Sequence, residues 1–173
     1  NSDLVGKFIN IPSRTSGFIS KYFESKLVPI KNIEDKKARE LILGITDMKD
    51  LVLEHYELRL FSKLTKLLMT QVEALNEFVS NKEPWILAKN KDQHQVNSDL
   101  HQICSTCLHS FRLVSIFLTP IIPELTTKIA LFFNESPYES FSDIEIEADS
   151  ITKYEHLMQR LDLKDIEAMV NSN

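Results

Sequence analysis

Apolar residues recur along this chain every three or four positions, which is the spacing of a helix and not of a strand. Residues at this period lie on one face of an α-helix and leave the polar residues on the other face. The pattern therefore predicts an all-α fold, a bundle of about five helices with an irregular C-terminal tail. We expect the helices over residues 3–26, 34–56, 61–81, 98–118 and 124–134.

Prolines mark the ends of several of these segments. Pro84 follows the third helix, and Pro120 and Pro123 separate the fourth helix from the fifth. A residue before proline avoids the helical region, whereas proline itself suits a first helical turn. Beyond the fifth helix, residues 135–152 are predicted to be irregular, and the alternation in "DIEIEA" (143–148) indicates a short extended piece.

The composition adds a size and a class to this pattern. The 173 residues are 43% apolar and 26% charged, which is the range of a globular protein, and only three are glycine. We expect one domain over 1–173, with the bundle at about 3–134 and a linker and tail at 135–173. No apolar run is long enough for a membrane span, so no membrane partner is expected.

The net charge of −5 argues against a broad contact with duplex nucleic acid, and so against DNA as a partner. It leaves room for recognition of a few unstacked bases, which depends on stacking and hydrogen bonds. Two cysteines, Cys104 and Cys107, have C-x-x-C spacing but fall on the apolar stripe of the fourth helix. We interpret them as reduced core thiols of a cytoplasmic protein and not as a metal site.

Catalytic motifs are absent from the sequence. It contains neither a phosphate-binding glycine loop nor a G-x-S-x-G or H-E-x-x-H pattern. An acidic cluster in the irregular region is interpreted as a solvated segment; it comprises Asp143, Glu145, Glu147 and Asp149. We assign no catalytic and no metal-binding residue to this chain.

The first helix carries a polar stripe that has the character of a binding surface. Its members are Gly6, Asn10, Ser13, Arg14, Gly17 and Lys21. Asn10 and Arg14 are four residues apart, so their side chains can converge, and an amide beside a guanidinium suits the edge of a nucleobase. The alternative is that the stripe packs against a neighbouring helix, with Arg14 paired to a carboxylate. Pro12 is expected to kink this helix by leaving the carbonyl of Phe8 without its donor.

The only tryptophan, Trp85, follows Pro84 in the segment "KEPWILAKN" (82–90) and is surrounded by charged residues. It is either a core residue or a flat platform exposed for a ligand. Stacking of a base on such a ring contributes roughly 1–3 kcal/mol. Phosphates could be contacted by nearby lysines, for which the candidates are Lys21, Lys82, Lys89 and Lys91.

Four segments of the chain resemble one known family in the order that the family has them. "NSDLVGKFINIPSRTSGFISKYF" (1–23) is similar to the helix that opens the anticodon-binding domain of methionyl-tRNA synthetases. "EPWILAKN" (83–90) resembles the family's proline–tryptophan segment. "LHQICSTCLHSFRLVSIFLTPIIPELTTKI" (100–129) resembles the following helix and turn, and "RLDLKDIEAMV" (160–170) resembles the closing segment.

The resemblance implies a helical bundle that reads the CAU anticodon of methionine tRNA. The recognising residues of the family fall on Asn10, Arg14 and Trp85, with Pro84 beside the tryptophan. In the family the tryptophan stacks on an unstacked base, and the asparagine and arginine read base edges. Pro12 departs from the small residue usual in the family.

The resemblance also implies a parent enzyme, a methionine–tRNA ligase, whose catalytic domain is not in this chain. ATP with magnesium, methionine and any zinc knuckle would belong to that missing part, and the chain itself is expected to hold no cofactor. Apolar residues of the tail are candidates for contact with the catalytic domain; they are Leu157, Leu161, Leu163 and Ile166. Two alternatives remain open at this point, a helical protein-interaction scaffold and the anticodon domain of a related class I synthetase.

Overall fold

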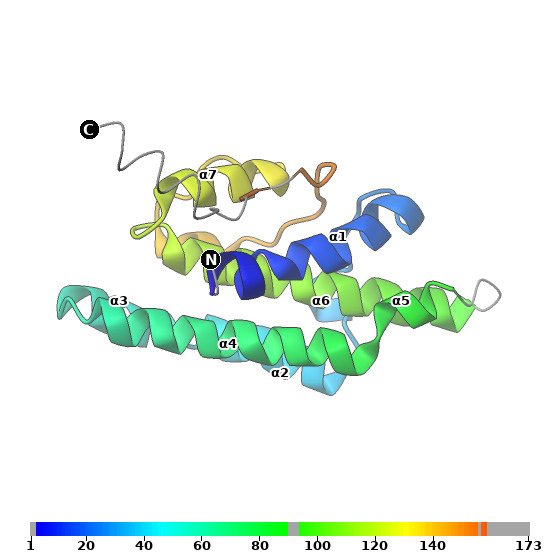
Figure 1. Ribbon diagram of the computed structural model, residues 1–173, viewed down its shortest axis with the longest axis horizontal. Helices are drawn as coiled ribbons and strands as arrows, with labels where there is room; N and C mark the ends of the chain where they lie inside the picture. Colours follow the sequence, from blue (N-terminus) through cyan, green and yellow to red (C-terminus); the bar gives the residue numbers. More distant parts are fainter. Residues whose placement is uncertain (1–2, 90–93, 156, 159–173) are drawn as a thin grey trace, which may run out of the picture.

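A computed structural model describes residues 3–89, 94–155 and 157–158 of the chain (Figure 1). The described residues form helices and turns, and their one β-type contact is an antiparallel bridge between Lys26 and Ser150. The α-helices are α1 (Asn10–Tyr22), α2 (Lys36–Thr46), α3 (Lys49–Glu57), α4 (Phe61–Lys82), α5 (Pro84–Leu87), α6 (His94–Leu118) and α7 (Pro123–Phe132). A π-helical turn, η1 (Leu4–Phe8), and two 3-10 turns, η2 (Ile30–Asn32) and η3 (Phe141–Glu145), complete them. The predicted all-α bundle is confirmed.

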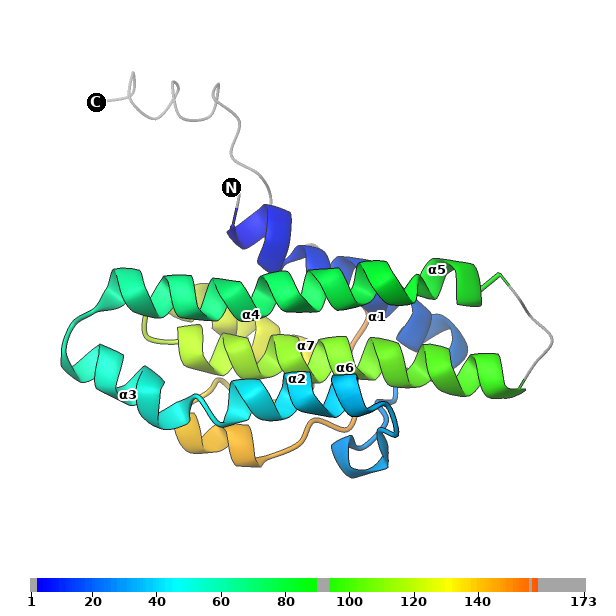
Figure 2. The same cartoon turned by 90° about the horizontal axis from the view of Figure 1, so that it is seen from below.

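Helix α6 is the centre of the bundle. Helices α1, α2, α4, α5 and α7 all contact it, as Figures 1 and 2 show from two directions. From Leu100 to Leu118 its side chains are buried with the exception of His101, which is half-buried. The largest fully buried side chains around it are phenylalanines, namely Phe8, Phe78, Phe111, Phe117 and Phe133.

The first predicted helix is divided where Pro12 enters it. The amides of Phe8 and Ile9 donate to carbonyls five residues back, at Asp3 and Leu4, so the chain begins with the wide π-helical turn η1. Helix α1 then begins at Asn10, which puts Pro12 in its first turn, where a missing N–H costs least. The expected interruption is therefore present, but as a change of helix type at Ile9. The helix ends at Tyr22, before Glu24 and Ser25, whose φ angles are 52° and 61°.

The second predicted helix, 34–56, is wrong as one element, because the structure has two helices there. Helix α2 ends at Thr46 and α3 begins at Lys49. Neither proline nor glycine stands between them. The hydroxyl of Thr46 donates to the carbonyl oxygen of Ile42, a local bond that competes with the regular helix.

The later helices keep their predicted identities with shifted ends. Helix α4 extends one residue beyond the expected 61–81. Helix α6 begins at His94, before the expected cap at Asn97 or Ser98, and still ends at Leu118. Helix α7 is shorter than the expected 124–134 at its C-terminal end.

The region after α7 is irregular, as predicted, but the extended piece expected at 143–148 is wrong at its start. Residues Phe141–Glu145 form the 3-10 turn η3, because Ser140 and Asp143 make a capping box. The chain then runs antiparallel to the segment after α1: the amide of Leu27 donates to Asp149 O and that of Ile151 to Ser25 O. Of the tail residues predicted to contact the catalytic domain, Leu161, Leu163 and Ile166 lie outside the described residues.

Candidate nucleic-acid interface

Helices α1 and α4 lie side by side and run in the same direction, toward the short helix α5 (Figures 1 and 2). Three polar pairs join η1 and α1 to α4. They are Lys7 with Glu73, Asn10 with Asn76, and Arg14 with Ser80. The two members of each pair are separated by 66 residues in the sequence, so the helices pack in a constant register. We call these three pairs the polar seam.

At the start of the polar seam, the ammonium group of Lys7 lies 2.9 Å from Asp3 and 2.6 Å from Glu73. Its hydrogen bonds to Glu73 and Asp3 raise the pKa of Lys7. The group is on the surface, so these contacts fix the orientation of the side chain more than they stabilise the fold.

The middle pair of the polar seam sets the orientation of an amide. Nδ2 of Asn76 donates to the carbonyl oxygens of Lys7 at 3.0 Å and Val72 at 2.9 Å. Its Oδ1 therefore faces α1 and accepts a hydrogen bond from Nδ2 of Asn10 at 3.1 Å. Because the oxygen and nitrogen of an amide lie on opposite sides, the Oδ1 of Asn10 is directed away from Asn76.

The last pair of the polar seam brings the predicted site residues together. Both terminal nitrogens of Arg14 lie 3.4 Å from the hydroxyl of Ser80. The guanidinium carbon of Arg14 lies 4.9 Å from the centre of the Trp85 ring, within the range of a cation–π contact. The helix-packing alternative is correct in that the stripe meets α4. Its expected carboxylate partner is not found, since no described carboxylate forms an ion pair with Arg14.

Trp85 is held at a sharp corner between α4 and α5. Glu83 adopts a left-handed conformation, with φ 45° and ψ 55°, and Pro84 begins α5 with its side chain buried. Trp85 is half-buried and packs against the core on one side. Leu87 and Ala88, which follow it in α5 and at its end, are also half-buried, whereas Ile86 is exposed. The ring is therefore partly a core residue and partly a surface, and the two interpretations of the sequence both apply.

The surface beside Arg14 is open. Ser13 and Gly17 are exposed, and a Cβ atom added to Gly17 would meet no atom within 4 Å. Farther along the same face, the ammonium group of Lys21 lies 5.0 Å from the ring centre of Tyr22. Asn10, Arg14 and Trp85 thus border a surface that is open beside Gly17 and that a flat ligand could approach.

The other predicted lysines differ in what they contact. Lys89 is exposed, whereas Lys82 pairs with Asp35 at the start of α2 and lies over the ring of Phe78. Burial raises the pKa of Asp35, but the hydrogen bonds from Lys82 and from the amide of Ala38 outweigh it, and the pKa is lowered. Lys82 therefore also joins α4 to α2. Lys91 lies outside the described residues.

Asn76 and Ser80 were missed in the sequence. They are four residues apart on α4, as Asn10 and Arg14 are on α1. This matching spacing is a signal that could have been noticed, but pairing the two helices requires their register, which periodicity does not provide.

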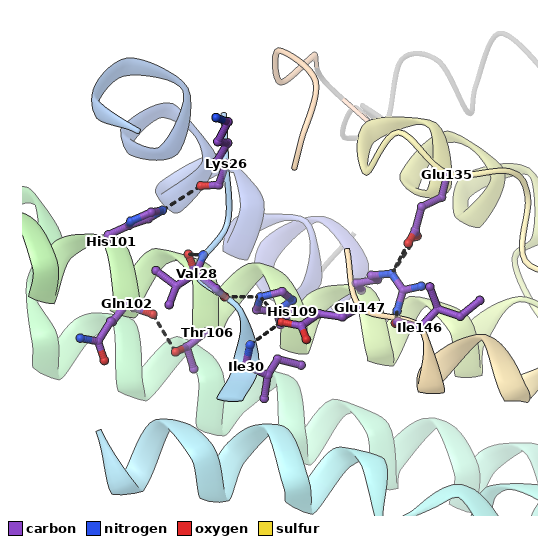
Figure 3. A network of polar contacts seen from close by, with 12 residues as sticks. Lys26, Val28, Ile30, His101, Gln102, Thr106, His109, Glu135, Ile146 and Glu147 are labelled. Carbon is purple, nitrogen blue, oxygen red and sulfur yellow. Dashed lines mark hydrogen bonds and ion pairs between the residues drawn. The ribbon is translucent and has the colours of Figure 1, made fainter. Parts of the chain in front are cut away.

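On another face of α6, polar side chains hold irregular backbone in place (Figure 3). Nε2 of His101 donates to the carbonyl oxygen of Lys26 at 2.8 Å, and Nε2 of His109 to that of Val28 at 2.9 Å. Burial is the main cause that lowers the pKa of each histidine. Glu147 approaches His109 at 3.8 Å and accepts from the amide of Ile30.

Arg112 continues this network at the other end of α6. Its Nε donates to Glu135 at 2.7 Å, and its terminal nitrogens donate to the carbonyl oxygens of Ile146 and Asp143. The prediction that the acidic cluster is a solvated segment is therefore wrong for two of its members. Glu147 joins this network, and Glu145 pairs with Lys49 at 3.0 Å.

The cysteines lie where their position on the apolar stripe predicts. Cys104 and Cys107 are both free and buried, and burial raises the pKa of the Cys107 thiol to about 12. Among the described residues, no group of three or more potential ligand side chains could hold a metal ion. The described helices also include none that is long and apolar enough to cross a membrane.

Comparison with known proteins gives one consistent result, although no family model matches the chain. It is 39% identical over 171 residues to a methionine–tRNA ligase of Methylibium petroleiphilum, and 40% identical over 176 residues to one of Thiobacillus denitrificans. These alignments cover 98% and 100% of this chain and 24% of each relative, so the chain spans about a quarter of the length of the curated relatives it matches.

The fold is also similar to that of a solved structure. The free-state methionyl-tRNA synthetase of Mycobacterium tuberculosis superposes with a TM-score of 0.84 over 94% of this chain and 33% of that one, at 17% identity. At this identity the likeness is one of fold. The sequence relatives name the family, and the chain therefore belongs to the methionyl-tRNA synthetases, as a homologue of about a quarter of a full-length enzyme.

Proposed function

We propose that this chain is the anticodon-binding domain of a methionine–tRNA ligase and reads the CAU anticodon of methionine tRNA. Methionylation with ATP would take place in the catalytic part of the enzyme, which this chain does not include. The observation that carries the proposal is the contact between Arg14 and Trp85, 4.9 Å from guanidinium carbon to ring centre. The contact joins the first helix to the proline–tryptophan segment, two regions 71 positions apart that the sequence predicts separately as binding surfaces.

The chemistry of this surface suits unstacked bases. A partly exposed indole offers a stacking face, which is worth roughly 1–3 kcal/mol per base. The planar donors of Arg14 and the outward Oδ1 of Asn10 supply hydrogen-bonding groups for base edges, and a good bidentate contact discriminates by about 1–3 kcal/mol. Neither contribution needs a basic protein, so the net charge of −5 is compatible with the proposal.

The test is a titration of the chain with RNA stem-loops that differ only in the triplet. A CAU loop should bind about 5- to 150-fold more tightly than loops with one changed base, since each mismatch removes about 1–3 kcal/mol. Trp85→Ala should weaken binding of the CAU loop by roughly 1–3 kcal/mol. Equal affinity for all triplets would overturn the proposal, and a preference for another triplet would point to a related synthetase.

A scaffold without an RNA role predicts a different outcome. In that case no stem-loop would bind specifically, at low or at high salt. The same titration should be repeated with a full-length enzyme, in which the missing part can contribute further contacts to the tRNA.

A further inference from the structure

A second aromatic ring is exposed on the helix that carries Asn10 and Arg14. Tyr22 is the last residue of α1, and it is 38% exposed. The ammonium group of Lys21 lies 5.0 Å from the centre of its ring. A cation over an aromatic ring is the arrangement that Arg14 and Trp85 also have, although the Trp85 ring is half-buried.

The cations of the two pairs, Arg14 and Lys21, lie on one side of α1. Lys21 follows Arg14 by seven residues, which is nearly two turns, so both point to the same side about 10 Å apart along the axis. Between them stands Gly17, where an added Cβ would meet nothing within 4 Å. The surface from Arg14 to Lys21 is therefore open, and a strand of unstacked nucleotides could follow it.

The Tyr22 ring has a firm support. It packs edge-on against Phe23, with ring centres 6.4 Å apart, and Phe23 stacks on His101 of α6 at 4.0 Å with the planes 3° apart. Nε2 of His101 in turn donates to the carbonyl oxygen of Lys26. A ring that is already fixed loses little conformational entropy when a base stacks on it.

The charges around Tyr22 permit a phosphate to approach. Glu24 is the nearest acid in sequence, and its carboxylate lies 3.7 Å from the ammonium group of Lys26. Lys21 itself has a long flexible stem and three donors, so its ammonium group can leave the ring face for a phosphate oxygen.

We propose that Tyr22 and Lys21 form a second nucleotide subsite, in which the Tyr22 ring stacks on a loop base that flanks the anticodon triplet and Lys21 contacts its phosphate. This subsite rests on the proposed anticodon-binding function, because only an unstacked anticodon loop would present a free base to the Tyr22 ring next to the triplet. It extends the recognised segment beyond the triplet and is indifferent to which base it stacks.

The test combines changes in the protein with changes in the RNA. Tyr22→Ala should lower the affinity for a CAU stem-loop about 5- to 150-fold, whereas Tyr22→Trp should retain it. An abasic nucleotide at one flanking position should weaken wild-type binding by a similar factor and have little further effect on Tyr22→Ala. Lys21→Gln should make the slope of log affinity against log salt shallower by about 0.7.

The control is Leu131→Ala on α7, which removes another exposed apolar side chain, 58% exposed, from a different helix. It should leave RNA affinity unchanged, and thermal melts of both variants report whether the bundle is intact. Should Tyr22→Ala melt early, the abasic series with the folded Tyr22→Trp and Lys21→Gln proteins decides the question.

Two failures are distinguishable. If the wild-type chain prefers CAU but Tyr22→Ala binds within about twofold of it and no flanking abasic position matters, the subsite is overturned and the proposed function stands. If the wild-type chain shows no triplet preference, the proposed function is overturned, and the subsite falls with it.

Discussion

The side-chain amides of Asn10 and Asn76 meet across the polar seam, with Nδ2 of Asn10 donating to Oδ1 of Asn76 at 3.1 Å. Asn76 has no freedom to turn around, because its own Nδ2 donates to two backbone carbonyls, those of Lys7 and Val72. Asn76 thus decides which atom of the Asn10 amide is directed away from α4. Asn76 is a positioning residue for Asn10.

Asn76→Ala removes this constraint. We expect it to cost about 1 kcal/mol in the free energy of unfolding, since Lys7 O loses its donor. It should also narrow the difference in affinity between CAU and changed triplets, because the amide of Asn10 can then rotate. Chemical denaturation and stem-loop titration measure the two effects. Unchanged triplet discrimination in a folded Asn76→Ala protein would show that Asn10 does not depend on Asn76.

Arg14→Lys separates charge from shape. Lysine keeps the positive charge but lacks the planar fork that lies over the Trp85 ring and that we propose contacts a base edge. We expect discrimination among triplets to fall by about 1–3 kcal/mol. The thermal stability should be nearly unchanged, because Arg14 is half-buried and its contacts with the Ser80 hydroxyl and the Trp85 ring lie at the surface. If Arg14→Lys discriminates as the wild type does, charge alone accounts for its contribution.

Lys82 and Lys89 form a matched pair of tests. Lys82→Gln should lower the free energy of unfolding by up to about 1 kcal/mol, because it breaks a partly exposed ion pair with Asp35. Lys89→Gln should leave stability unchanged and make the salt dependence of RNA binding shallower by about 0.7. Lys82→Gln should change that slope less. The reverse order of slopes would assign the phosphate contact to Lys82.

The buried histidine His109 predicts a pH dependence of stability. Burial holds its pKa below the ordinary value of 6.5, although the Val28 carbonyl and Glu147 act in the other direction. Between the folded pKa and about 6.5, the unfolded chain binds a proton that the folded chain does not, so stability falls as the pH falls through this window. The pKa of His101 is lowered in the same direction.

Denaturation at a series of pH values from about 7 to 5 measures this loss. His109→Gln can keep a donor for Val28 O and should flatten the curve. His55→Gln, which changes a histidine that contacts Leu51 O outside this network, is the control. Equal pH dependence in the His109→Gln and wild-type proteins would contradict the assignment.

Long apolar repeats made the helices of the bundle predictable. Helix α4 was located almost to the residue, because its buried face repeats without interruption from Leu64 to Val79. The start of α6 was missed because its apolar period begins only at Leu100, after the helix has begun at His94. The division between α2 and α3 was missed because no proline or glycine marks it.

The candidate site was predictable in part, from helical spacing and from residue type. Asn10 and Arg14 share a face by their spacing alone, and Trp85 stood out as a lone ring beside a proline. Their partners Asn76 and Ser80 depend on the register between two helices 66 residues apart, and the pairing of Lys82 with Asp35 depends on how α2 meets α4. Such relations are set by tertiary packing, which no local pattern contains.

Trp85 provides the most direct measurement of the central claim, because it is the only tryptophan in the chain. Its fluorescence can be followed during titration with a CAU stem-loop whose binding is monitored separately through a label on the RNA. We predict a saturable change in the Trp85 signal that tracks the label and shifts to higher RNA concentration when one base of the triplet is changed. Binding of the labelled RNA with no change in Trp85 fluorescence would contradict the account.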